Sequence, residues 1–153
     1  MDLQDSVCRF LVVDDDEDVI AITELVYAGM TIMGRAVACS YARSSDEALG
    51  LLTANRFELG IIDVVMRTDR EGLELVRWIR AQPEHRSMAI VVRTGQVGIA
   101  PPEVAFAESD IDAYWSKTEL PAQRMRSEAT RLVLARMAAN GGVRMSDIHT
   151  IVP

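Results

Sequence analysis

Three apolar runs of this chain each end in a residue that could take part in phosphoryl chemistry. Asp63 lies in IIDVVM, Thr94 in VVRTG and Lys117 in AYWSK. A carboxylate can attack phosphorus and form an aspartyl phosphate. A hydroxyl and an ammonium group can hold the outer oxygens of a transferring phosphoryl group, over which its charge is spread. We therefore predict that Asp63 accepts a phosphoryl group and that Thr94 and Lys117 contact it.

A fourth apolar run ends in the acidic residues Asp14, Asp15 and Asp16. Carboxylates that are crowded together repel one another, which raises their pKa values, and a bound divalent cation removes this repulsion. Mg²⁺ prefers oxygen ligands, whereas zinc is usually bound through nitrogen or sulfur, which these motifs do not offer. We predict an Mg²⁺ site that includes Asp14, Asp15 and Asp63.

The elements that must position these residues are short buried strands alternating with helices. Continuous apolar runs are typical of strands buried on both faces. Two capping-box patterns, Ser44 with Glu47 and Thr68 with Glu71, predict helix starts. The predicted strands cover residues 9–13, 36–42, 59–62, 88–92 and 113–115, and the predicted helices cover about 16–26, 46–55, 68–82, 102–108 and 120–139.

This alternation predicts a three-layer α/β fold with a doubly wound, flavodoxin-like (βα)5 arrangement. We expect a parallel five-stranded sheet with strand order 2-1-3-4-5. Ligands bind such sheets at the carboxyl ends of the strands, where the strand order reverses. That point lies between the first and third strands, so Asp14, Asp15 and Asp63 should meet there.

The composition bounds the class of protein. The chain has 153 residues, which suits one domain, and we expect this domain over 1–140 with a tail or linker over 141–153. The net charge of −7 argues against nucleic acid or an anionic membrane as a direct partner. No apolar run approaches the ~20 residues of a membrane span. We expect a cytoplasmic protein.

Together, the motifs resemble the receiver domain of bacterial two-component response regulators, over about residues 8–137. The resemblance implies that Asp15, Asp63 and the Val65 backbone carbonyl coordinate Mg²⁺ directly, while Asp14 acts mainly through water. It also implies that Tyr114 is a switch residue together with Thr94.

The resemblance further implies a signalling switch that catalyses only its own phosphorylation and slow dephosphorylation. Its phosphoryl donor would be a phosphohistidine on a sensor histidine kinase or histidine phosphotransfer protein. Its output would be an unidentified downstream protein, and the fourth helix and fifth strand could form a homodimer face.

The chain departs from the usual receiver pattern at two positions. The loop after Asp63 is about one residue longer and has Arg67 where proline is usual. Lys117 is followed by Thr118 and not by proline. A cis bond before a residue other than proline costs about 3–4 kcal/mol, so we predict a trans Lys117–Thr118 peptide or a locally strained turn there.

Two alternative functions remain open at this point. The second half of the chain resembles receivers that precede HD-type cyclic-dinucleotide phosphodiesterase domains. The chain could thus be the N-terminal receiver of a larger regulator with a cyclic-di-GMP phosphodiesterase output domain. A haloacid-dehalogenase-type phosphatase uses similar groups, but its nucleophile follows the first strand, and here the acid pair comes first.

Overall fold

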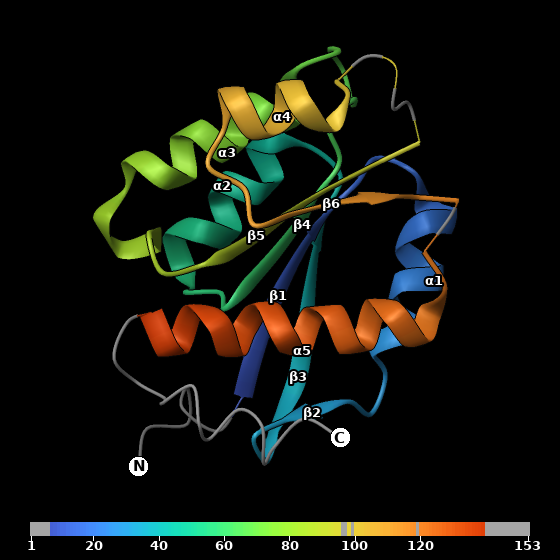
Figure 1. Ribbon diagram of the computed structural model, residues 1–153, viewed down its shortest axis with the longest axis vertical. Helices are drawn as coiled ribbons and strands as arrows, with labels where there is room; N and C mark the ends of the chain where they lie inside the picture. Colours follow the sequence, from blue (N-terminus) through green and yellow to red (C-terminus); the bar gives the residue numbers. More distant parts are fainter. Residues whose placement is uncertain (1–6, 96–97, 99, 119, 140–153) are drawn as a thin grey trace.

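A central sheet with helices on both faces forms the fold (Figure 1). The computed structural model describes residues 7–95, 98, 100–118 and 120–139. The strands are β1 (Val7–Val13), β2 (Thr31–Ile32), β3 (Arg35–Ala42), β4 (Leu59–Ile62), β5 (Ala89–Thr94) and β6 (Ala113–Ser116). The helices are α1 (Glu17–Tyr27), α2 (Ser45–Ala54), α3 (Glu71–Ala81), α4 (Pro102–Glu108) and α5 (Ala122–Ala139), with a 3-10 helix η2 (Pro83–His85) after α3.

The helices divide between the two faces of the sheet. In Figure 1, α1 and α5 cover one face, and α2, α3 and α4 cover the other. Five strands pair in parallel, which confirms the predicted α/β class. Within the described part of the chain, no helix is both long and apolar enough to cross a membrane.

The predicted five-stranded order is incomplete, because in the described part of the chain the sheet has six strands, in the order β2-β3-β1-β4-β5-β6. The additional strand, β2, pairs antiparallel with the start of β3. A two-residue turn joins them, with φ values of 52° at Met33 and 76° at Gly34. Tight hairpins favour such positive φ values, usually through Asn-Gly or Gly-Gly. Met-Gly lacks this signal, and the hairpin was therefore missed.

The helix starts confirm one predicted capping box and contradict the other. Ser44 accepts a hydrogen bond from the Glu47 amide at 3.2 Å and caps α2. The predicted cap of α3 at Thr68 is wrong. That helix begins after Arg70, which makes no side-chain capping bond, and the carboxylate of Glu71 is engaged with other groups.

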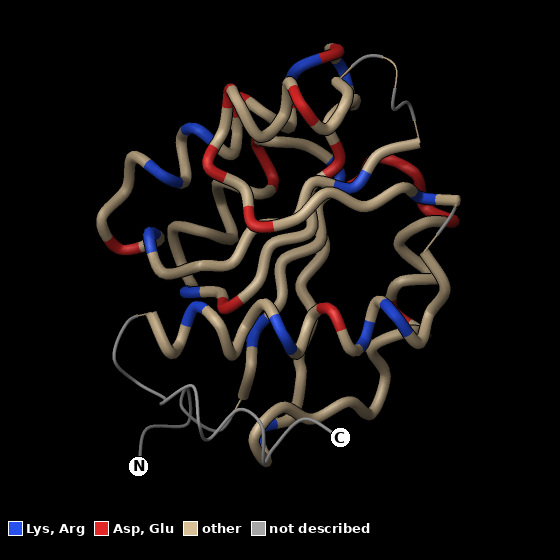
Figure 2. Tube along the Cα trace, viewed as in Figure 1, with Lys and Arg blue, Asp and Glu red and all other residues tan. Residues whose placement is uncertain are grey.

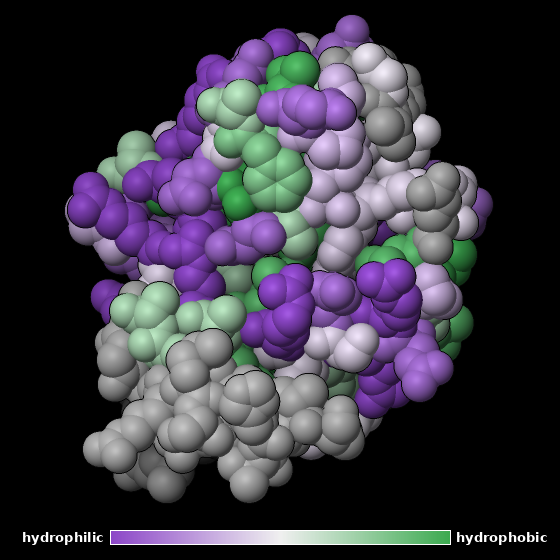
Figure 3. Space-filling model, viewed as in Figure 1, coloured by the Kyte–Doolittle hydropathy of each residue, from purple (hydrophilic) through white to green (hydrophobic). Residues whose placement is uncertain are grey.

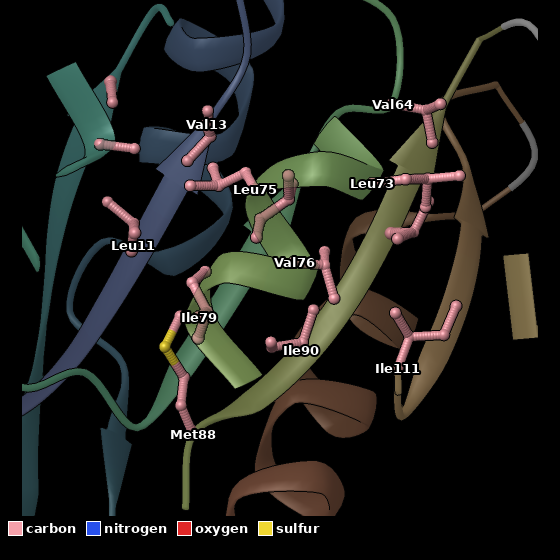
Figure 4. Packing of buried hydrophobic residues seen from close by; sticks show 14 of the residues in the cluster. Leu11, Val13, Val64, Leu73, Leu75, Val76, Ile79, Met88, Ile90 and Ile111 are labelled. Carbon is pink, nitrogen blue, oxygen red and sulfur yellow. The ribbon is translucent and has the colours of Figure 1, made fainter. Parts of the chain in front are cut away.

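Two hydrophobic clusters, one on each face, hold the helices to the sheet. Figure 4 shows the cluster between the sheet and α3, where side chains of Leu11, Val13 and Ile90 face those of α3. The second cluster joins Phe10 and Trp115 to residues of α1 and α5. Because the sheet is buried on both faces, its strands read as continuous apolar runs.

The start of α3 lies unusually close to the end of β4. The Gly72 amide donates a hydrogen bond to the Val64 carbonyl at 2.9 Å. A Cβ atom on Gly72 would overlap the backbone carbonyl of Asp63. Glycine at this position therefore lets α3 pack against the residue on which the predicted site depends.

We expect Gly72→Ala to lower the free energy of unfolding by about 3 kcal/mol, because the backbone must shift to relieve the overlap. Gly50→Ala is the matched control: Gly50 is exposed on α2, and a Cβ there meets no atom within 4 Å. The control should stabilise the protein by up to about 1 kcal/mol. Urea unfolding measures both, and equal effects of the two substitutions would contradict the close approach.

Candidate functional site

The residues predicted from four separate motifs meet at the carboxyl edge of the sheet. Asp14 follows β1, Asp63 follows β4, Thr94 ends β5 and Lys117 follows β6. The backbone holds these positions together, since the Asp63 amide donates to the Val13 carbonyl at 2.9 Å and the Lys117 amide donates to the Thr94 carbonyl at 3.0 Å. A pocket of about 240 Å³ opens there, lined by Asp15, Asp16, Asp63, Val65, Met66, Thr94, Gly95 and Lys117.

Three carboxylates form an acidic cluster that could hold a metal ion. One oxygen each of Asp14, Asp15 and Asp63 lie within 4.8 Å of one another. Asp14 and Asp63 are buried, whereas Asp15 is exposed. An all-oxygen donor set with room for water suits Mg²⁺, which binds through a few carboxylates and keeps several waters.

Lys117 bridges the two buried carboxylates of this cluster. Its Nζ atom lies 2.9 Å from Asp14 Oδ2 and 3.0 Å from Asp63 Oδ2. Burial lowers the pKa of Lys117, but the hydrogen bonds and charges of Asp14 and Asp63 outweigh burial and leave the pKa raised. The ammonium group therefore stays charged and partly neutralises the acid pair.

The environment of Asp63 disfavours the ionised form of its carboxyl group and raises its pKa. Burial and the neighbouring charge of Asp14 raise the pKa of Asp63 to about 6, against opposing contributions from Lys117 and the Val65 amide. The Val65 amide donates to Asp63 Oδ1 at 3.3 Å. Asp63 is thus largely ionised at neutral pH and can act as a nucleophile.

A second charged cluster fixes the loop between β4 and α3. The Glu71 carboxylate accepts hydrogen bonds from the Arg67 amide at 2.8 Å, from Arg67 Nη2 at 2.7 Å and from the Ser45 amide at 3.2 Å. Burial raises the pKa of Glu71, but these hydrogen bonds outweigh it and bring the pKa to about 2. The loop that carries Val65 is thereby tied to the start of α2.

Tyr114 lies beside the site and does not line its pocket. Its ring packs against the hydrophobic cluster on the α3 face, and its hydroxyl donates a 2.7 Å hydrogen bond to the Ala100 carbonyl between β5 and α4. The prediction of a trans Lys117–Thr118 peptide is confirmed. The predicted tail, 141–153, lies outside the described residues.

The sequence reasoning missed Arg93, a buried cation on β5. Only 6% of this residue is exposed, and its Nη1 atom donates to the Thr23 hydroxyl of α1 at 2.7 Å. Figure 2 shows basic segments at the ends of β5 and β6 beside the acidic run that begins α1. A charged residue inside the apolar run AIVVRT was the available signal.

The chain belongs to the response regulator receiver domain family, which its residues 10–127 match. Because this match assigns most of the chain to the receiver family, it rules out a haloacid-dehalogenase-type phosphatase. The chain is also 39% identical, over 118 residues, to the 3'3'-cGAMP-specific phosphodiesterase 2 of Vibrio cholerae serotype O1. The aligned part is 76% of this chain and 23% of that relative. The chain therefore spans about a quarter of the relative's length.

Solved receiver structures share the fold. A receiver domain protein from Methanospirillum hungatei superimposes with a TM-score of 0.72 at 20% identity, covering 88% of this chain and 99% of that one. The signal receiver domain of an HD domain-containing protein from Pseudomonas fluorescens gives 0.73 at 18% identity, covering 90% and 95%. Receiver domains are signalling switches that interact with histidine kinases or phosphotransfer proteins and with output domains.

Asp63→Asn should stabilise the metal-free protein at about pH 7.5 by about 1–2 kcal/mol. The folded pKa of about 6 exceeds the ordinary 3.8, so the stabilising contribution of the protonated carboxyl group is lost as pH rises through 6. The advantage of the variant should therefore shrink as pH falls toward about 4.

Urea unfolding in EDTA at several pH values measures this advantage. Asp69→Asn is the control, because Asp69 is exposed in the same loop. Its unfolding free energy should stay within about 0.5 kcal/mol of the wild type. An advantage of Asp63→Asn that is independent of pH would contradict the raised pKa.

Proposed function

We propose that this chain is a phosphorylation-activated receiver in a two-component phosphorelay, with Asp63 as the phosphoacceptor. The observation that carries the proposal is the meeting of Lys117 Nζ with Asp14 and Asp63 in a pocket that Thr94 also lines. Nucleophile, cation and hydroxyl come from three different strand ends, and each suits one part of a phosphoryl-transfer reaction.

In the proposed reaction, an Asp63 carboxylate oxygen attacks the phosphorus of a phosphohistidine. The new O–P bond forms as the P–N bond breaks, and the electron pair leaves with the imidazole of the donor protein. Lys117 then exchanges part of its contact with Asp63 for a phosphoryl oxygen, and the Thr94 hydroxyl donates to another. Asp15, Asp63 and the Val65 carbonyl would hold Mg²⁺, which would neutralise the charge of the phosphoryl oxygens.

We propose that the new charge is transmitted through the end of β5. Phosphorylation adds close to two negative charges, and Thr94 and Tyr114 would respond as the switch pair. The Tyr114 hydroxyl donates a hydrogen bond to the Ala100 carbonyl, so a shift of Tyr114 would move Ala100, two residues before the start of α4.

The face over α4 is the proposed output surface. Phe106 on α4 is 50% exposed, and Figure 3 shows apolar side chains over α4 beside hydrophilic ones from α3. An output protein, or a second copy of the chain through α4 and β6, could cover this apolar surface.

We also propose that residues 1–140 are the N-terminal receiver of a larger regulator and control the activity of its output domain. The Vibrio cholerae relative is a phosphodiesterase four times as long as the matched segment, and the Pseudomonas fluorescens structure comes from an HD domain-containing protein. Residues 141–153 would then act as the linker to a cyclic-dinucleotide phosphodiesterase domain.

Incubation with acetyl phosphate and Mg²⁺ should place one phosphoryl group on Asp63, because its carboxylate borders both the pocket and Lys117. Intact-protein mass spectrometry should show this adduct in the wild type and in Asp69→Asn. Asp63→Asn should show none, and EDTA should suppress the adduct. Labelling of Asp63→Asn to the wild-type extent would refute the assignment.

Val65→Asn should shorten the phosphoryl lifetime roughly fivefold, which corresponds to about 1 kcal/mol in the barrier. Val65 is half-buried and lines the pocket two residues after Asp63, and an amide there could orient an attacking water. Val65→Ile keeps the side chain apolar and serves as the control. Decay of the adduct after removal of acetyl phosphate gives the lifetimes, and identical lifetimes would show that Val65 does not limit water access.

A further inference from the structure

Arg93 is a charged side chain in the apolar layer between the sheet and α1. Its Nη1 atom donates to the Thr23 hydroxyl at 2.7 Å, and Thr23 is fully buried. The Thr23 hydroxyl in turn donates to the Val19 carbonyl at 2.6 Å. The hydroxyl thus accepts from Arg93 while it donates within α1, so this bond connects β5 directly to the middle of the helix.

The position of Arg93 on β5 makes this connection relevant to the pocket. Successive side chains of a strand point to opposite faces, and Arg93 directly precedes Thr94, which lines the pocket. Ala89 and Val91, which share the face of Arg93, pack in the cluster that includes α1 and α5. An anchor on Arg93 therefore fixes the strand end from the face opposite to the Thr94 side chain.

The charge of Arg93 also acts on the acidic cluster. A guanidinium group stays protonated in proteins. Burial lowers the pKa of Arg93, while the negative charges of Asp14 and Asp63 oppose that change. Salt screens an interaction between buried groups much less than one at the surface. Lys117 lines the pocket, and Arg93, the residue before Thr94, is a second cation whose charge interacts with Asp14 and Asp63.

We infer that Arg93 is a positioning residue that holds the Thr94 end of β5 against α1 through Thr23, and whose buried charge favours an anion on Asp63 while opposing a cation. The inference rests on the proposed function for the anion. If Arg93 acts through its charge, removing that charge should strengthen metal binding and weaken anion binding. A purely structural role would not change the two affinities in opposite directions.

The test compares Arg93→Met, Arg93→Lys and Thr23→Val with the wild type. Calorimetry measures Mg²⁺ affinity alone, and then the affinity for beryllofluoride, a phosphoryl mimic, at saturating Mg²⁺. For Arg93→Met, we expect Mg²⁺ to bind roughly fivefold more tightly and beryllofluoride about tenfold more weakly, changes of about 1 and 1.4 kcal/mol in binding free energy. Arg93→Lys keeps the charge and should restore most of both affinities.

Thr23→Val keeps the charge of Arg93 and removes only the hydroxyl that anchors it. It should leave Mg²⁺ affinity unchanged and weaken beryllofluoride binding several-fold, and it carries the test if circular dichroism shows that Arg93→Met does not fold. Parallel weakening of both ligands in Arg93→Met, or unchanged anion binding in Thr23→Val, would overturn the inference. Failure of the proposed function is distinguishable, because the wild type itself would then bind no beryllofluoride and take no phosphoryl group on Asp63.

Discussion

The contact of Lys117 Nζ with two buried carboxylates is the interaction on which the rest of the site depends. Burial and the negative charge of the neighbouring Asp14 both disfavour ionisation of Asp63 and raise its pKa. Lys117 lies 2.9 Å from one and 3.0 Å from the other, and this lets Asp63 remain largely ionised at neutral pH. The compensation is incomplete, since the pKa of Asp63 is still raised to about 6. The negative charge that Lys117 leaves uncompensated therefore favours the binding of a divalent cation at this site.

The surrounding structure holds this charge arrangement in place from several sides. Gly72 lets α3 approach the Asp63 backbone, and Glu71 ties the loop after Asp63 to α2 through Arg67 and Ser45. On the opposite face, Arg93 ties β5 to α1. Glu71, Gly72 and Arg93 do not line the pocket themselves, but each holds the backbone next to residues that do. Their shared effect is to fix strand ends, which is where a parallel sheet gathers its ligand groups.

The fold and the residues that meet in the pocket could be predicted from the sequence because both follow from local patterns. Apolar runs that end in Asp14, Asp63, Thr94 and Lys117 indicate buried parallel strands, and parallel strands bring their carboxyl ends together. The β2 hairpin was missed because Met33 adopts a positive φ without a sequence signal for it. Arg93 interrupts the apolar run AIVVRT, but its contact with Thr23 was missed because a contact between residues 70 positions apart leaves no periodic trace. The capping box predicted at Thr68 was wrong because the Glu71 carboxylate binds Arg67 and the distant Ser45 instead.

The most direct measurement is a crystal structure of the protein with Mg²⁺ and beryllofluoride. The account predicts an adduct on an Asp63 carboxylate oxygen, with Lys117 and the Thr94 hydroxyl in contact with its fluorine atoms. It also predicts a metal ion bound by Asp15, Asp63 and the Val65 carbonyl. An adduct on another residue would contradict the account. So would a structure in which Asp63 carries no adduct and Lys117 still lies between Asp14 and Asp63.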